Sequence, residues 1–367
     1  MYYRLFFLKL NKTRNILQQQ CLLVVVVILA VLFSSCKTST IKENAFRANV
    51  DKITFESNIV DSNHIDCTDI KYGFEGGDFK KVGDTFHLFV NEKYNDVATI
   101  NNRFGHWIST DLNNWQRKST VLQFNFDTLG NVPNACIYNP ELEFSKKDNS
   151  WYLFYMQFKS EPSRKGGWYN RYDGRVMLSK SKTEGINGIS GPYEKGNAVF
   201  QSNDTGSWEG LQGVTGFSPY PVGNKWYALY GSANTENIPC DHWRLGVATS
   251  NSLTGIWHPI ENNIPIPLEF QAESPKVNKI NNEYFAIVDE ISGKENFSLL
   301  VSKNGIDWDF YTAIEFLPVE KWQWKEIRTP IGFFVESDTC FTFYTTYYKN
   351  DDFAPISKLK FHINHNN

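Results

Sequence analysis

Two glutamates stand in turns that could supply a pair of carboxylates for acid–base chemistry. Glu273 lies in ESPKV (273–277), directly before Ser-Pro and the start of a strand pattern, and Glu75 lies in FEGGD (74–78). Proline limits the backbone freedom of such a turn, and the residue before a proline is held extended, so the Ser-Pro sequence would aim the Glu273 side chain. A carboxylate in a surface turn is usually solvated or salt-bridged. The chemical interpretation therefore requires that the fold bring the two turns together.

The turn of Glu273 is part of a unit that recurs five times from residue 70 onward. Each copy has a strand pattern, a polar tight turn and a second, aromatic strand, at a spacing of about 55 to 80 residues. Four copies begin near a proline, and the first has Gly77 in its place. The copies are residues 74–90, 138–158, 217–232, 273–290 and 328–348.

A second unit, a polar turn that ends on an aromatic residue, follows four of the five copies. It reads STDLNNW, SNSLTGIW and SKNGIDW in three of them and is longer at residues 179–193. Such a turn closes an outer hairpin, so each repeat supplies four strands. The pattern predicts an all-β fold, a five-bladed β-propeller over about residues 68–364, with the segment 53–60 helping to close the ring. A β-sandwich is the alternative, but it does not predict the fivefold recurrence.

The propeller prediction places the repeated turns around one axis. The innermost strand of each blade lines the central channel, and the loops that enter these strands form one rim of it. Alignment of the copies on their prolines predicts two rings of residues: Glu75, Tyr138, Phe217, Glu273 and Arg328 in the first, and Gly76, Asn139, Ser218, Ser274 and Thr329 in the second. Glu273 should then face the same axial pocket as Glu75, with Arg328, Asn139 and Ser218 available to bind substrate.

Two acids that converge on one funnel fit glycoside hydrolysis. The reaction needs one carboxylic acid to protonate the departing oxygen, and one carboxylate to activate water or to attack the anomeric carbon. Aromatic walls would partly desolvate Glu273 and favour the protonated form that a proton donor requires. Glu75, closer to Arg328 or to water, would stay ionised as the base. The arginine could also hold a sugar hydroxyl or carboxylate.

With these motifs the chain resembles the five-bladed β-propeller glycoside hydrolases, family 43 and relatives such as families 32, 62 and 117. ESPKV is similar to the E-x-P turn of blade 4 that carries a catalytic glutamate in these families, and YNPELEF with WYLFY resembles their blade 2 motif. The outer turns STDLNNW and SKNGIDW are of the kind seen there as well. The resemblance covers almost all of residues 70–350. It implies an inverting mechanism in which Glu75 or Asp78 activates water.

Two blades depart from the family 43 pattern. Blade 1 has Glu75 in register where these enzymes have an Asp-Pro turn, with Asp78 three residues further on. Blade 3 has Ser218 where they bring a third aspartate that tunes the acid, and Glu209 or Glu141 could substitute for it. The likeness thus predicts a relative of family 43, and it does not identify the sugar on which this chain acts.

Further residues are candidates for substrate contacts. Trp208 and Trp168 lie in predicted loops, where a sugar-stacking platform competes with a place in a hairpin core. His242 begins a strand in DHWRLG, and RFGHW sets Arg103 and His106 in the same way, although histidine packed against tryptophan is more often structural. The sequence has no Gly-rich phosphate loop, no Ser-His-Asp order and no clustered metal ligands, so neither a cofactor nor a metal is expected.

The N-terminus has the features of a bacterial lipoprotein signal. Basic residues precede twelve uninterrupted apolar residues (22–33), too few to span a bilayer, and Ser-Ser-Cys follows. This resembles a lipobox and predicts lipid attachment at Cys36, with an uncleaved membrane anchor as the alternative. We expect export and a lipid anchor to the bacterial membrane, on its periplasmic or its surface face. The expected parts are a signal peptide at 1–35, a tether at 36–52 and the propeller at 53–367.

Composition narrows the classes of partner. The net charge is −3 with both signs mixed along the chain, so nothing indicates a nucleic-acid partner. The other mature cysteines are widely spaced, which argues against zinc and allows either disulfides or free thiols: Cys67, Cys136, Cys240 and Cys340. The sequence favours a hydrolase acting on plant or algal polysaccharides or oligosaccharides. A phosphorolytic enzyme and a non-catalytic glycan-binding propeller remain as alternatives.

Overall fold

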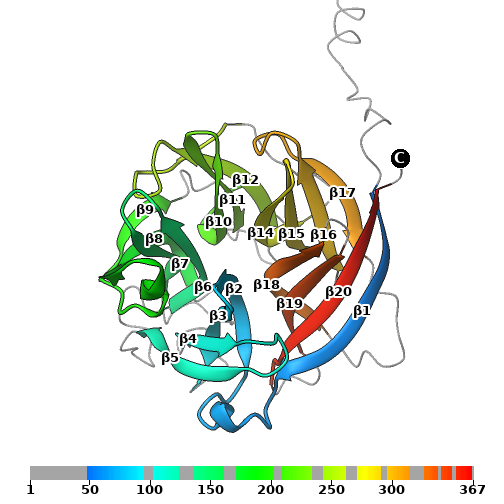
Figure 1. The fold of residues 1–367 in the computed structure, drawn as a ribbon. Coiled ribbons are helices and arrows are strands. Elements are labelled where there is room, and N and C mark those ends of the chain that lie inside the picture. The colour runs from blue at the N-terminus through cyan, green and yellow to red at the C-terminus, as the bar shows by residue number, and fades with distance from the viewer. Residues whose placement is uncertain are drawn as a thin grey trace, which may run out of the picture. The chain divides into compact units, whose positions relative to one another are not determined.

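Five four-stranded antiparallel sheets form a ring, which confirms the predicted five-bladed β-propeller (Figure 1). The first strands of neighbouring blades contact each other and surround the axis. The computed structural model describes residues 48–94, 102–123, 136–160, 171–201, 208–233, 243–261, 271–290, 296–314, 326–337, 340–348 and 353–365.

Blades 1 to 4 each use four consecutive strands, ordered from the axis outward. The strands of blades 1 and 2 are β2 (Phe74–Val82), β3 (Thr85–Lys93), β4 (Asn102–Ser109), β5 (Gln116–Gln123), β6 (Cys136–Ser145), β7 (Ser150–Ser160), β8 (Arg171–Glu184) and β9 (Asn197–Gln201). Those of blades 3 and 4 are β10 (Val214–Val222), β11 (Lys225–Ala233), β12 (Trp243–Ser250), β13 (His258–Pro259), β14 (Ala272–Ile280), β15 (Glu283–Glu290), β16 (Asn296–Ser302) and β17 (Asp309–Ile314).

Blade 5 closes the ring with strands from both ends of the described chain. It combines β18 (Glu326–Ser337), β19 (Cys340–Tyr348) and β20 (Ile356–His365) with β1 (Ala48–Val60) as its outermost strand. The prediction that segment 53–60 helps to close the ring is confirmed, and β1 begins earlier than expected. A bridge between Gly73 and Ala354 also joins the start of blade 1 to blade 5. Closure therefore rests on backbone hydrogen bonds between distant parts of the sequence.

Aromatic side chains fill the spaces between blades. Phe154 of blade 2 stacks on Phe217 of blade 3 with ring centroids 5.6 Å apart, and Trp257 meets Phe217 edge-on at 5.0 Å. Phe79 of blade 1 stacks in the same way on Tyr344 of blade 5, at 5.1 Å. Each sheet is covered on both faces by its neighbours, so its inner strands carry apolar residues in nearly continuous runs. Most of the aromatic side chains that the structure describes are thus part of the core.

The recurring outer turns join the third strand of a blade to the fourth. In blade 1, Ser109 Oγ and Asp111 Oδ1 accept hydrogen bonds from backbone N–H groups of the turn, and Ser302 and Asn304 do the same in blade 4. Serine, aspartate and asparagine favour such turns because their side chains replace backbone partners. The aromatic residues that end the turns are buried: Trp115, Tyr193, Trp257 and Trp308. The motif is therefore a turn followed by a core anchor.

A buried histidine pair lies in blade 1. His87 Nδ1 and His106 Nε2 are 2.9 Å apart, and the ring of His106 stacks on Phe89 at 4.3 Å. Burial lowers the pKa of His87 to about 4 and that of His106 to about 3, so both are neutral at pH 7. Arg103 is likewise occupied, because it pairs with Glu92 and Asp69. These contacts therefore support a structural role for Arg103 and His106 of the RFGHW motif.

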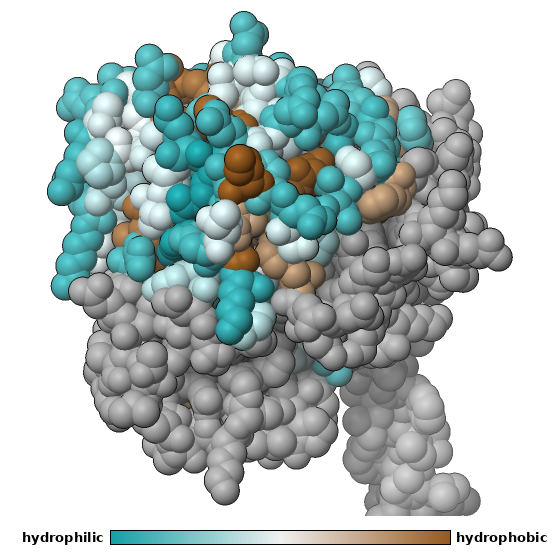
Figure 2. All heavy atoms as spheres, turned by 90° about the horizontal axis from the view of Figure 1, so that it is seen from below, coloured by the Kyte–Doolittle hydropathy of each residue, from teal (hydrophilic) through white to brown (hydrophobic). Residues whose placement is uncertain are grey.

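Figure 2 shows one side on which hydrophilic residues predominate and hydrophobic ones are scattered. Within the described residues, the large hydrophobic side chains that are exposed lie outside the sheets, in a short 3-10 helix after β1, another in the outer turn of blade 2, and the outer turn of blade 3: Ile65, Ile186 and Ile256. None of the helices in these residues is long and apolar enough to cross a membrane.

The histidine pair predicts an acid-sensitive fold. Below about pH 6.5 the unfolded chain binds protons at both histidines, whereas the folded chain does not until its lowered pKa values are reached. The free energy of unfolding should therefore fall as the pH drops from 6.5 toward 4. Urea denaturation between pH 7.5 and 4.5 should give a shallower decline for a His87→Gln/His106→Phe variant than for the wild type. Equal slopes for the two proteins would contradict this assignment.

Candidate active site

Each of the five inner strands leaves regular antiparallel pairing near its start. A β-bulge bends its strand and redirects side chains, and bulges are frequent next to active sites. The irregular steps lie between Glu75 and Gly77, Tyr138 and Glu141, Val214 and Gly216, Glu273 and Lys276, and Ile327 and Pro330. The turn that recurs in the sequence is thus a recurring bulge beside the axis.

Three of these bulges contain a residue in the left-handed region. Gly76 has φ +67°, Asn139 +48° and Ser274 +51°. Glycine adopts this conformation freely and asparagine often does, whereas for serine it costs about 1 kcal/mol. Ser274 was expected to be extended because it precedes Pro275, and that prediction is wrong. The bulge, held between its ladder partners, sets this φ against the local preference.

The bulge of blade 1 requires glycine for a second reason. A Cβ on Gly76 would lie 1.8 Å from Asn139 Oδ1, so the amide of blade 2 occupies the space that a side chain would need. Asn139 Nδ2 in turn donates to the carbonyl of Thr215 in blade 3 over 2.8 Å. These contacts tie the inner strands of three blades together around the axis.

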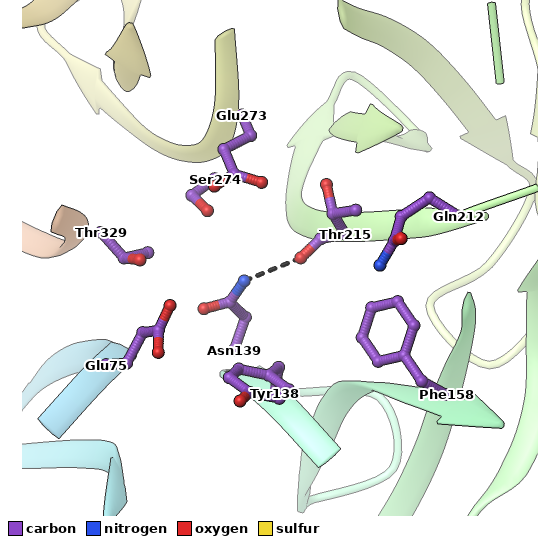
Figure 3. Close-up of a pocket in the computed structure, with 9 residues that line it drawn as sticks. All are labelled: Glu75, Tyr138, Asn139, Phe158, Gln212, Thr215, Glu273, Ser274 and Thr329. Carbon is purple, nitrogen blue, oxygen red and sulfur yellow. Dashed lines mark hydrogen bonds between the residues drawn. The ribbon is translucent and has the colours of Figure 1, made fainter. Parts of the chain in front are cut away.

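A pocket at this level contains both predicted catalytic glutamates (Figure 3). It encloses about 320 Å³, including its open mouth. Glu75 and Glu273 enter it from blades 1 and 4 and are buried, with 7 % and 8 % of their surfaces exposed. The lining is Glu75, Tyr138, Asn139, Phe158, Gln212, Thr215, Glu273, Ser274 and Thr329. The predicted convergence of Glu75 and Glu273 on one axial pocket is therefore confirmed.

Glu75 has a buried cationic partner. Its carboxylate forms an ion pair with Lys93 at the end of β3, and both side chains are more than nine-tenths buried. A positive charge paired with a carboxylate favours the ionised form of that carboxylate. The sequence had assigned that effect to Arg328. The backbone of Arg328 lies in the bulge of β18, and its side chain is outside the described part of the chain.

Glu273 has a buried acid beside it. Asp289 of β15 is its direct partner in the ladder, and directly opposed residues of an antiparallel pair lie on the same face of the sheet. Acids at directly opposed positions of a sheet disfavour the doubly ionised state, which helps one of them to keep its proton. Asp289 was not singled out from the sequence, because it stands at the end of an ordinary strand pattern, YFAIVDE.

Lys276 connects the two turns that carry the glutamates. It lies three residues after Glu273, and its Nζ donates to the carbonyl of Gly77, two residues after Glu75. The same Nζ forms a buried ion pair with Glu141 of blade 2. Burial raises the pKa of Glu141, and Lys276 opposes that shift. One side chain therefore joins blades 1, 2 and 4 beneath the pocket.

Three predicted site residues line a second pocket instead of the first. Asp78, Glu141 and Ser218 lie with Lys276 around a separate space of about 330 Å³. Asp78 accepts hydrogen bonds from the N–H groups of Phe79 and Leu142, both over 2.7 Å, so it links blades 1 and 2. These residues follow the bulge along their strands. The expectation that they share the pocket with Glu75 and Glu273 is therefore wrong.

In blade 3 the alignment on proline fails. Pro219 pairs regularly with Ala228, and the bulge falls earlier, at Thr215. Thr215 therefore takes the place in the ring that was predicted for Ser218. Phe217, predicted to face the axis, packs into the core between blades. The proline marks the bulge in blades 2 and 4, but in blade 3 it belongs to the ladder.

The remaining candidates lie away from the pocket or outside the described residues. Glu209 accepts a hydrogen bond from the Tyr230 hydroxyl, and Trp208 packs on the same tyrosine with ring centroids 5.6 Å apart. Neither lines the pocket. The cysteines whose side chains are described, Cys67 and Cys340, are free thiols. The predicted positions of Cys36, Trp168, Cys240 and His242, and the side chain of Cys136, lie outside the description.

Sequence reasoning missed part of the lining. Gln212, Thr215 and Phe158 enter the pocket from the blade 2 and blade 3 side, and Tyr138 and Thr329 appeared only as members of the aligned rings. The only sequence signal for Thr215 is Val-Thr-Gly before the aromatic strand, which does not indicate chemistry by itself.

Within the described residues, no group of three or more histidines, cysteines or acids is arranged to hold a metal ion.

Comparisons with known proteins identify the fold. No model of a known family matches the sequence, and no curated protein sequence matches it. Among solved structures, a family 117 glycoside hydrolase from the marine bacterium Zobellia galactanivorans superposes with a TM-score of 0.60 at 13 % identity, over 86 % of this chain and 91 % of that one.

Two further structures have the same architecture. A thermostable family-43 glycoside hydrolase gives a TM-score of 0.54 at 17 % identity, covering 78 % of this chain and 88 % of its own. An α-L-arabinofuranosidase from Lactobacillus brevis gives 0.54 at 11 % identity, over 78 % and 90 %. At these identities the likeness is one of fold.

Removal of the Lys276 cation should strongly destabilise the protein. Lys276→Met would leave Glu141 buried without its partner, which costs about 3–5 kcal/mol. A Lys276→Met/Glu141→Met double variant removes both charges and should recover most of that loss. Urea denaturation of the wild type, both single variants and the double variant measures the coupling. A Lys276→Met variant as stable as the wild type would show that the pair is not formed.

Proposed function

We propose that this protein is a glycoside hydrolase in which Glu273 is the general acid and Glu75 the general base. The observation that carries the proposal is the convergence of two buried glutamates, from blades 1 and 4, on one axial pocket. Hydrolysis of a glycosidic bond by two carboxyl groups requires this arrangement, with one group on each side of the anomeric carbon.

The surroundings of the two glutamates support different protonation states. Lys93 favours ionised Glu75, which suits a group that must take a proton. Glu273 is the direct ladder partner of the buried Asp289, and a neighbouring acid favours the protonated form of one of the two, which suits a group that must hold a proton. Environments that separate the pKa values of two acids are the usual way to assign such roles.

The proposed reaction is a single displacement with inversion. Protonated Glu273 donates its proton to the departing glycosidic oxygen as the bond to the anomeric carbon breaks. Glu75 removes a proton from a water molecule, whose oxygen forms the new bond to that carbon from the opposite face. The products are a shortened glycan and a sugar of inverted configuration. Proton exchange with solvent restores both glutamates.

The similar structures support the class of reaction and not the sugar. They include a family 117 and a family-43 glycoside hydrolase and an α-L-arabinofuranosidase. We infer a plant or algal polysaccharide, or oligosaccharides derived from one, as the substrate. A phosphorolytic enzyme would need basic groups to bind phosphate, and the described lining of the pocket offers none in support.

We also propose that the protein is an exported lipoprotein anchored through Cys36. The support is the basic segment, the twelve apolar residues and Ser-Ser-Cys at the N-terminus. An anchored hydrolase would act on glycans at the cell envelope.

Glutamine substitutions should separate the acid from the base. Glu273→Gln should lower kcat on glycosides with unactivated leaving groups by about 10²- to 10⁴-fold, because proton donation is lost. Dinitrophenyl glycosides, whose leaving group needs no proton, should be partly spared. Glu75→Gln should impair both substrate types. The exposed Glu194→Gln is the matched control and should behave as wild type.

Product analysis completes the test. NMR of the first product formed should show inversion at the anomeric carbon. Retention of configuration would refute the single displacement. A Glu273→Gln variant that hydrolyses natural glycans at the wild-type rate would show that Glu273 is not the general acid. A protein that binds glycans with wild-type affinity in all variants, and turns none over, would be a binding propeller.

Cys36→Ser should release the protein from the membrane fraction or mislocalise it. The thiol is the proposed site of lipid attachment, and without it signal processing should fail or the product should be mislocalised. Fractionation with immunoblotting measures the distribution, and mass spectrometry of the wild type should show a lipid-modified N-terminal Cys36. An intact segment 1–35 on the mature wild-type protein would disprove the proposal.

A further inference from the structure

Three polar atoms in the wall of the candidate active site lack hydrogen-bond partners among the described residues. They are Asn139 Oδ1, Gln212 Oε1 and Thr215 Oγ1, and all three belong to residues that line the pocket. Gln212 is only 1 % exposed, and the other two residues are 6 % exposed. Buried polar atoms are normally satisfied, and those that are not cost free energy, so such a cluster calls for a bound partner.

Gln212 and Thr215 lie on the side of the pocket away from Glu75, and Asn139 lies between them and Glu75, with its Oδ1 toward Glu75 (Figure 3). These residues come from the inner strand of blade 2 and from the entrance to blade 3. The Asn139 amide is oriented by its hydrogen bond to the Thr215 carbonyl. Phe158 and Tyr138 flank them and add apolar surface. Amide and hydroxyl groups beside aromatic carbons suit a ligand that has hydroxyls on its edge and C–H groups on its face.

The backbone around Gln212 is held firmly. Its carbonyl accepts a hydrogen bond from the N–H of Gly174 in β8 over 3.0 Å. A Cβ on Gly213 would lie 2.3 Å from Gly174 N, so the two chains are in close contact. A wall that is already ordered loses little conformational entropy when a ligand binds.

The charge of the pocket selects the ligand further. Two carboxyl groups lie in it, and no basic side chain is among its described lining residues. Lys93 is already paired with Glu75, and the described lining offers a sugar carboxylate no further basic group, so a charged sugar would meet like charge in a partly desolvated site. The hydrogen-bonding wall and the charge therefore favour the same ligand class.

We propose that Asn139, Gln212 and Thr215 form the specificity-determining wall of this site, and that they bind the hydroxyl groups of an uncharged sugar residue. The inference rests on the proposed function, since it assigns the sugar class to the same pocket. A site built to hydrogen-bond hydroxyls discriminates strongly, because a ligand that cannot satisfy its buried polar groups leaves them unpaired.

Binding and stability measured together test the proposal. The probes are galactose, glucose, xylose and arabinose, with galacturonate and glucuronate as charged counterparts of the first two, titrated calorimetrically into the Glu273→Gln variant. At least one neutral sugar should bind, and its 6-carboxylate counterpart, where there is one, should bind at least tenfold more weakly. Gln212→Leu and Thr215→Val, added to that variant, should each weaken binding at least tenfold. The exposed Gln201→Leu is the matched control.

The thermal midpoint separates recognition from a structural role. Gln212→Leu and Thr215→Val each remove an unpartnered buried oxygen and keep a side chain of similar size, so the midpoint should stay equal or rise while binding weakens. Uronates that bind as tightly as the neutral sugars would overturn the proposal, as would variants with unchanged affinity or the absence of binding by every probe.

Turnover by the enzyme with intact Glu273 distinguishes this inference from the proposed function. Neutral glycosides hydrolysed with unchanged kcat/KM by Gln212→Leu would sink the inference and leave the hydrolase intact. If neutral sugars bind through this wall but the wild type hydrolyses no glycoside, the inference holds and the proposed hydrolase function is refuted.

Discussion

Where the five inner strands leave regular pairing, the chain gives up ladder hydrogen bonds and gains control over the direction of its side chains. An unbroken strand alternates its residues strictly between the two faces of a sheet, and a bulge breaks that alternation at one point. Glu75 and Glu273 stand at such points, in blades 1 and 4. The left-handed Gly76 and Ser274 follow them directly. The pocket exists because the bulges lie side by side around the axis.

Such a centre must carry its charges in a buried environment. Lys93 compensates Glu75, and Lys276 compensates Glu141 while it also holds the carbonyl of Gly77. Each of these contacts joins two strands or two blades, so the electrostatic compensation also fixes the geometry. A buried ion pair adds little net stability but is costly to break, and it therefore resists displacement of the turns that it connects. The second pocket, with Asp78, belongs to this supporting layer.

Packing between blades supplies the stability that the axis does not. Aromatic rings from facing sheets, such as Phe154 and Phe217, fill the wedges, and each outer turn ends on an aromatic residue that reaches the core. The axis can therefore be lined by polar groups, including Gln212 and Thr215, whose unpaired atoms reduce stability. The ring of sheets holds them in place, as is common when strain or unpaired polarity is concentrated at a functional site.

Repetition in the sequence determined the architecture, because five copies of one strand-and-turn pattern leave few alternatives to a ring of five blades. It also determined that Glu75 and Glu273 face the same pocket, since equivalent positions of a propeller face the same axis. Repetition did not determine the register of strand pairing within each blade. Proline marks the bulge in blade 4 but pairs in the ladder of blade 3, and this one difference moved Ser218 into another pocket and brought in Thr215.

The partners of the acids were likewise decided by the tertiary structure. Lys93 and Asp289 stand at the ends of ordinary strands, and nothing in their local sequence distinguishes them from solvated surface charges. They meet Glu75 and Glu273 only because antiparallel pairing brings the end of the second strand back to the start of the first. A local pattern fixes which residues share a face of a strand. Long-range pairing decides which of them touch.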